Sequence, residues 1–269
     1  MLHHVLLLVV IGLIATHLFA SPSRVTTEGF QSSPADLSEL EPEDDPRDLP
    51  WIASWSPADR AARHGQICAV TFTEEGPHGT TIQTVSKTCE AGMAHTRPGD
   101  RIVIPDSIPM PHRDQTIRHE LIHIHQRRNP DAWRTFYRRS WSFQFAAAPP
   151  RGLPAAVQAA RRSNPDTWDP ATGGPWAVWQ GRYWPLAIYT DPQTPRLRES
   201  RTVWWDDTRQ ELLEFPPASW TAFFGSDTET AQPEHPHELA AVYLTAESRG
   251  SEAARRLDDW WASFSWKNM

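Results

Sequence analysis

The first predicted elements come from two runs in which apolar and polar residues alternate with period two. The runs QICAVTFTE (66–74) and GTTIQTVSK (79–87) meet at a Gly-Pro-His-Gly turn, residues 76–79. Two such runs around a turn predict a β-hairpin. A third short strand is expected in DRIVIPD (100–106), and Pro105 ends it because proline lacks the amide hydrogen that a strand needs.

Helical spacing replaces the alternation further along the chain. Apolar residues recur every three or four positions up to Arg128, which predicts an α-helix with Asp114 as its N-cap. Asn129 and Pro130 end this helix and suit the start of a second one. The apolar positions of the second helix are Trp133, Phe136, Tyr137 and Trp141.

The remaining part of the chain, nearly half of its length, is expected to mix strands and helices. Residues 146–175 are rich in Pro, Ala and Gly, so only a short helix is expected there, near residues 154–162. Strand-like aromatic runs follow at 176–190, 201–205 and 210–215, and two helices at 236–248 and 252–266 close the chain. This order predicts an α+β fold, in which a small mixed or antiparallel sheet packs with the helix at 114–128 and with C-terminal helices.

The N-terminus reads as an export signal followed by a tether. Residues 1–20 contain an apolar run that is short for a membrane span and typical of a signal peptide, with a signal anchor as the alternative. Residues 21–49 are rich in Pro, Ser and acidic residues, which indicates a linker or pro-segment. Residues 50–269 are then the folded domain, either secreted or membrane-anchored outside the cytoplasm.

Charge and cysteine content refine this picture. The linker has eight acidic residues against Arg24 and Arg47, a net of −6 out of −7 for the whole chain. The domain is therefore almost neutral, and nothing in its charge indicates a nucleic-acid partner. Cys68 and Cys89 flank the predicted hairpin, and in an exported chain they are expected to form a disulfide.

The stretch TIRHELIHIHQRRNP (116–130) carries the candidate chemistry. On a helix, His119, His123 and Gln126 share one face, and the opposite face is apolar, with Ile117, Leu121 and Ile124. Zinc prefers neutral imidazole nitrogens, and two histidines spaced i and i+4 present them from adjacent turns. Glu120 is close enough to act on a metal-bound water, Gln126 is a candidate partner of a ligand, and His125 is expected at the surface or in a second layer.

The motif HELIHIHQR closely resembles the zinc helix of the HExxH metallopeptidases, the zincins. The resemblance implies that His119 and His123 bind zinc and that Glu120 is the catalytic base. It also implies that the strand before the helix, residues 101–105, forms the edge to which an extended substrate adds as another strand. The close-spaced glycine and last histidine of the metzincins are absent, which argues against that subclass.

A catalytic zinc needs a third protein ligand. The stretch PEHPHELAAVYLTAE (233–247) resembles the second helix of gluzincins, where a glutamate supplies this ligand, and Glu238 is the matching residue. Rival ligands in the same stretch are Glu234, His235, His237 and Glu247. In related enzymes a Tyr or His stabilises the oxyanion, and here Tyr183 is favoured over Tyr189 for that role.

Together these expectations describe an exported zinc-dependent peptidase that acts on a peptide or protein with a zinc-activated water and Glu120 as general base. Two alternatives stay open. One is a zinc-stabilised binding module without catalysis, which a fourth ligand such as His125 or His237 would indicate. The other is a zinc hydrolase of a non-peptide amide or ester, because the helix motif does not fix the acyl group.

Overall fold

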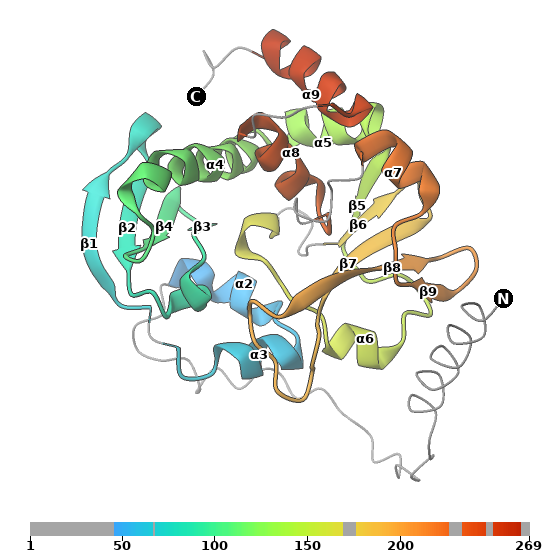
Figure 1. The fold of residues 1–269 in the computed structure, drawn as a ribbon, viewed down its shortest axis with the longest axis horizontal. Helices are drawn as coiled ribbons and strands as arrows, with labels where there is room; N and C mark the ends of the chain where they lie inside the picture. The colour runs from blue at the N-terminus through green and yellow to red at the C-terminus, as the bar shows by residue number, and fades with distance from the viewer. Residues whose placement is uncertain (1–45, 67, 169–175, 226–232, 246–249, 265–269) are drawn as a thin grey trace, which may run out of the picture. The chain divides into compact units, whose positions relative to one another are not determined.

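The computed structural model describes residues 46–66, 68–168, 176–225, 233–245 and 250–264, which belong to one compact unit, Leu40–Met269. The fold is α+β, as predicted, with two small sheets and C-terminal helices (Figure 1). The helices are α2 (Leu49–Ala53), α3 (Pro57–Arg63), α4 (Met110–Arg128), α5 (Pro130–Ser140), α6 (Ala155–Ala159), α7 (Ala218–Phe224), α8 (Pro236–Thr245) and α9 (Glu252–Ser263).

The first sheet has the order β1-β2-β4-β3, with β1 (Val70–Glu75), β2 (Thr81–Val85), β3 (His95–Arg97) and β4 (Arg101–Pro105). The predicted hairpin is confirmed, because β1 and β2 pair antiparallel. The expectation that residues 101–105 form an edge is wrong, since β4 pairs in parallel with β2 and antiparallel with β3. The edges of this sheet are β1 and β3, and the three residues of β3 are too few to show an alternating pattern in the sequence.

The second sheet is an antiparallel meander of β5 (Phe143–Ala146), β6 (Trp176–Trp179), β7 (Tyr183–Tyr189), β8 (Ser200–Asp206) and β9 (Glu211–Leu213). The aromatic runs in the sequence are these last four strands. Between β6 and β7 the chain turns through Gln180 and Gly181, whose φ angles are 54° and 64°. They are the central residues of a β-turn that is closed by a hydrogen bond from the amide of Arg182 to the carbonyl of Trp179, at 3.1 Å, and positive φ at both positions matches the twist of the sheet.

Helix α4 carries the motif and begins earlier than predicted. Its N-cap is Pro109 rather than Asp114, and a second proline lies in its first turn, where a missing amide hydrogen costs nothing. The predicted apolar face is confirmed, because it packs on the first sheet. The cluster consists of Ile117, Leu121 and Ile124 from α4 with Ile82, Ile102 and Ile104 from β2 and β4. This packing fixes which face of α4 is left for the histidines.

The helices after α4 build the main core. Asn129 is the N-cap of α5, and the four aromatic positions predicted for this helix are at most 2% exposed. They pack with one face of the second sheet and with α7, α8 and α9 in a single cluster. Helix α8 thereby lies beside α4 (Figure 1).

The folded part starts before the predicted boundary at residue 50. Asp48 is 1% exposed and accepts hydrogen bonds from Arg101, at 2.6 Å, and from Arg97, at 3.2 Å. The acidic composition of residues 21–49 predicts a linker, so the burial of Asp48 in an ion pair could not be recognised from the sequence. The predicted signal segment, residues 1–20, lies outside the described residues, and within those residues no helix has the length and apolar character of a membrane span. The predicted disulfide between Cys68 and Cys89 is present.

Candidate metal centre

Helix α4 presents the two motif histidines on one face. His123 is fully buried and His119 keeps 23% of its side chain exposed, and their Nε2 atoms are 3.2 Å apart. Burial lowers the pKa of His123 to about 3. This ring is therefore neutral near pH 7, which is the form that binds a metal.

Glu238 joins the two histidines from the first turn of α8. It is 1% exposed, and its Oε2 lies 3.6 Å from Nε2 of His119 and 3.6 Å from Nε2 of His123. A point equidistant from these three atoms is about 2.0 Å from each of them, which matches zinc–nitrogen and zinc–oxygen bond lengths. The donor set predicted from the sequence is thus brought together by the fold. The donors fit a zinc ion in distance and in chemistry.

Gln126 supports His123 from one turn further along α4. Nδ1 of His123 lies 2.9 Å from Oε1 of Gln126, so Nδ1 carries the proton and Nε2 keeps its lone pair for the metal. The amide of Gln126 donates to the hydroxyl of Tyr137, at 3.1 Å, and to the carbonyl of His237, at 3.0 Å. One buried amide therefore fixes the histidine and ties α4 to α5 and α8.

A segment that the sequence analysis did not single out completes the site. We call residues 161–168 the strap; it contains a 3-10 helix, η5 (Pro165–Thr167). Asn164 of the strap donates from Nδ2 to Oε1 of Glu238, at 2.8 Å. Two residues later, Oδ1 of Asp166 accepts from the amide and the hydroxyl of Thr96, each at 2.6 Å. The strap thus connects the third ligand of the site to the edge strand β3.

Arg127 of α4 also contacts the edge strand β3. Its guanidinium donates to the carbonyls of Pro165, at 2.8 Å, Thr96, at 3.3 Å, and Arg97, at 3.4 Å. The outward main-chain groups of Thr96 are therefore occupied by Asp166 and Arg127. A peptide cannot pair with Thr96 as an added strand while these contacts are in place.

Glu120 is buried next to the three donors. Burial, and then the carboxylates of Asp166 and Glu238, raise the pKa of Glu120 well above its ordinary value, while the guanidinium of Arg127 acts in the opposite direction. Its Oε2 is buried and has no hydrogen-bond partner among the residues that the structure describes. An unpartnered carboxyl oxygen at this position is available for a hydrogen bond with a group placed at the metal face.

A second trio, Glu120, His123 and Asp166, also comes within metal-binding distance. It shares His123 with the first trio, so the two are rival positions for one ion. The first trio is better prepared, because Asn164 already orients Glu238, whereas Gln126 orients His123, which both trios share. In the second trio, Asp166 is committed through Oδ1 to Thr96. His119, His123 and Glu238 are therefore the better candidate group for a metal ion.

The two tyrosines favoured as oxyanion donors lie elsewhere in the fold. Tyr183 is in β7, where its ring packs near Trp179 and under the guanidinium of Arg182. The hydroxyl of Tyr189 donates to Asp59, at 2.9 Å. None of these contacts is with a residue of the donor trio, and the role of Tyr183 as oxyanion donor stays a prediction. The tyrosine that the structure connects to the site is Tyr137, through Gln126.

The rival ligands are also placed. The ring of His237 packs against Tyr137 and Phe145, and His235 accepts a hydrogen bond at Nδ1 from the amide of His237, at 3.2 Å. Burial raises the pKa of Glu234 to about 7, and this residue is outside both trios. Glu247 lies outside the described residues.

His125 does not point to the metal face, and of its two expected positions, at the surface or in a second layer, the surface position is wrong. It is 1% exposed, accepts a hydrogen bond from the indole of Trp133, at 2.9 Å, and lies among the rings of Trp261 and Phe264. The covering residues come from α9 and the residue after it, more than 130 positions along the chain. Helical periodicity alone could not reveal that cover.

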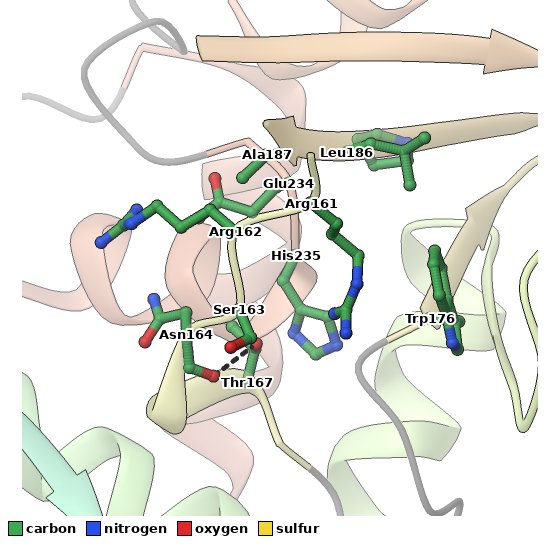
Figure 2. Close-up of a pocket in the computed structure, with 11 residues that line it drawn as sticks. Arg161, Arg162, Ser163, Asn164, Thr167, Trp176, Leu186, Ala187, Glu234 and His235 are labelled. Atoms are coloured by element: carbon green, nitrogen blue, oxygen red, sulfur yellow. Dashed lines mark hydrogen bonds between the residues drawn. The ribbon is translucent and has the colours of Figure 1, made fainter. Parts of the chain in front are cut away.

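A small cavity lies beside the strap, lined in part by Arg161, Trp176 and His235 (Figure 2). Figure 2 shows the side-chain amide of Asn164, which also lines the cavity, directed away from His235. The volume open to the centre of a water molecule in this cavity is about 20 Å³. This is enough for one water and too little for a peptide side chain. The cavity is therefore not a substrate pocket.

Comparison of the chain with known proteins gives no match to a protein-family model, to a curated protein or to a solved structure. The resemblance to zincins rests on the helix motif and on the geometry of the three donors.

Proposed function

We propose that this chain is a zinc-dependent hydrolase of amide bonds, with a peptide or protein as substrate. The observation that carries the proposal is the convergence of His119, His123 and Glu238 on one point, with Glu120 beside them. Glu238 reaches this point from a helix more than 100 residues away in the sequence. A helix that is rich in histidine by chance would not explain that convergence.

In the proposed mechanism, three residues would bind the metal and Glu120 would transfer the proton. His119, His123 and Glu238 would hold the zinc, which when bound supplies Lewis-acid chemistry toward an acyl oxygen and a water. Glu120 would take the proton of the attacking water and deliver it to the leaving nitrogen as the carbon–nitrogen bond breaks. The unpartnered Oε2 of Glu120 is available for this proton transfer.

The number of donors favours a catalytic over a purely structural metal. Structural zinc sites are closed by four protein ligands, whereas catalytic sites use three and keep one position open. Among residues in the described ranges, the candidate group has three members, and neither His125 nor His237 belongs to it. His119 is the most exposed of the three donors, so substrate would approach along its side.

One observation favours a second candidate, a hydrolase of a non-peptide amide or ester. Asp166 and Arg127 occupy the main chain of Thr96, so the β3 edge offers no strand pairing there to an extended peptide. A smaller acyl substrate would not need such pairing.

The test uses the zinc-loaded full-length protein and the Glu120→Gln variant. Cleavage of a mixed peptide library, followed by mass spectrometry, should be abolished in Glu120→Gln although its zinc content stays at the wild-type level. Glu234→Gln is the matched control, because it also neutralises a carboxyl group near α8 but lies outside the metal group, and it should keep activity. Wild-type turnover in Glu120→Gln would contradict the mechanism. Cleavage of small amides or esters but of no peptide would favour the second candidate.

A further inference from the structure

The side-chain amide of Asn164 is held in one orientation by two different partners. Asn164 is 8% exposed, and its Oδ1 accepts from the backbone amide of Asp166, at 3.0 Å. Its Nδ2 donates to Oε1 of Glu238, at 2.8 Å. If the amide were rotated by half a turn, Oδ1 of Asn164 would face the carboxylate of Glu238 and Nδ2 would face the N–H group of Asp166. Neither pair could form a hydrogen bond, so only one orientation of the amide is allowed.

The backbone that carries Asn164 is fixed on both sides. Before it, the amide of Ser163 donates to both carboxylate oxygens of Asp59, at 3.1 and 3.0 Å, and its carbonyl accepts from Arg63, at 3.1 Å. After it, the carbonyl of Pro165 accepts from Arg127, at 2.8 Å. The backbone on either side of Asn164 is therefore held in place by hydrogen bonds to Asp59, Arg63 and Arg127.

We propose that Asn164 is a positioning residue for Glu238 as a zinc ligand. By holding Oε1, it fixes the rotation of the carboxylate, so that Oε2 faces the two histidines. This inference rests on metal binding in the proposed function and extends it to a residue in a loop-rich segment. The alternative role of Asn164 is only to cap η5 through Oδ1.

The two roles can be separated by Asn164→Ser. Serine can still cap η5, because its hydroxyl accepts from the same backbone amide, but it is too short to reach Glu238. The matched control is Thr167→Val, which removes a hydrogen bond within the strap, from Oγ1 of Thr167 to the carbonyl of Asn164, and leaves the contact with Glu238. Both variants are made in the full-length chain.

Zinc affinity is measured by competition with a chelator, and the melting temperature of the metal-free protein is measured in parallel. Asn164→Ser should bind zinc about 10- to 100-fold more weakly, with little change in metal-free melting, whereas Thr167→Val should keep wild-type affinity. With cobalt in place of zinc, the visible absorption bands should shift in Asn164→Ser only. Equal zinc affinity and equal spectra in wild type and Asn164→Ser would overturn the inference.

Other outcomes distinguish the inference from the proposed function. If the wild-type protein bound no zinc, both the proposed function and the role of Asn164 would be refuted. If it bound zinc but hydrolysed no substrate, only the proposed function would be refuted. If Asn164→Ser does not fold, Asn164→Asp keeps the size and the cap and replaces the N–H donor by an oxygen. Its cobalt spectrum at pH 8 should differ from that of wild type, and an identical spectrum would refute the positioning role.

Discussion

Replacing Glu90 by glutamine tests the buried ion pair that anchors the strap. The carboxylate of Glu90 accepts two hydrogen bonds from Arg63, at 2.8 and 2.9 Å, and the same guanidinium binds Asp59 and the carbonyl of Ser163. Burial alone would raise the pKa of Glu90, but the charge and hydrogen bonds of Arg63 outweigh it and lower the pKa from 4.5 to about 2. At about 1.4 kcal/mol for each pH unit, this difference corresponds to about 3 kcal/mol of folding free energy.

The sign of the pH dependence follows from the direction of that change. Because the folded protein holds the proton of Glu90 less tightly than the unfolded chain, the stabilisation is complete above pH 4.5 and is lost as the pH falls toward 2. Urea unfolding at pH 7, 4 and 3, followed by tryptophan fluorescence, should show Glu90→Gln about 3 kcal/mol less stable than wild type at pH 7. The difference between the two proteins should shrink at the lower pH values.

The control for this experiment is Glu252→Gln on α9. The pKa of Glu252 is also lowered to about 2, because Arg255 and Arg256 donate hydrogen bonds to it, but these side chains are exposed. Solvent screens exposed pairs, so this variant should unfold like wild type. If both variants lost the same stability, or if the loss in Glu90→Gln did not change with pH, the argument from burial would be refuted.

Two further predictions concern the metal face. Gln126→Leu should weaken zinc binding about 10- to 100-fold in chelator competition, because Nδ1 of His123 loses the acceptor that fixes its tautomer, and unchanged affinity would contradict that role. Zinc affinity of the wild type should rise between pH 5.5 and 7.5, by about tenfold per pH unit for each proton displaced. The reason is that Glu238 outweighs the effect of burial and raises the pKa of His119, so a proton competes with the metal; a flat profile over this range would be evidence against the site.

The part of the site on α4 could be predicted because it depends on local geometry. Spacing of i and i+4 places His119 and His123 on one face of any α-helix, and the apolar residues on the other side decide which face is buried. The start of helix α3 also has a local sequence signal. Its N-terminus is a capping box between Ser56 and Asp59 with a proline in the first turn, and this pattern predicts a helix start.

The strap could not be predicted because its role depends on contacts across the fold. Asn164 is 74 positions from Glu238, and Asp166 is 70 positions from Thr96. Locally, the sequence there indicates only an Asn-Pro turn within a segment rich in Pro, Ala and Gly. The burial of His125 has the same explanation, because α9 and the residue after it supply its cover. Periodicity identifies the faces of an element, whereas the partner of each face is decided by tertiary packing.

The charges gathered at the site argue for a divalent cation. Glu120, Asp166 and Glu238 are buried carboxyl groups, and Arg127 is the cation whose charge acts on Glu120 and on Asp166. At formal charges, three carboxylates and one guanidinium leave −2, and an uncompensated buried charge is costly. Without a metal, the protein can offset this charge by binding protons, and the raised pKa values of Glu120 and His119 agree with that response. A zinc ion would supply the same two positive charges at one point, and it would free Glu120 to act as a base.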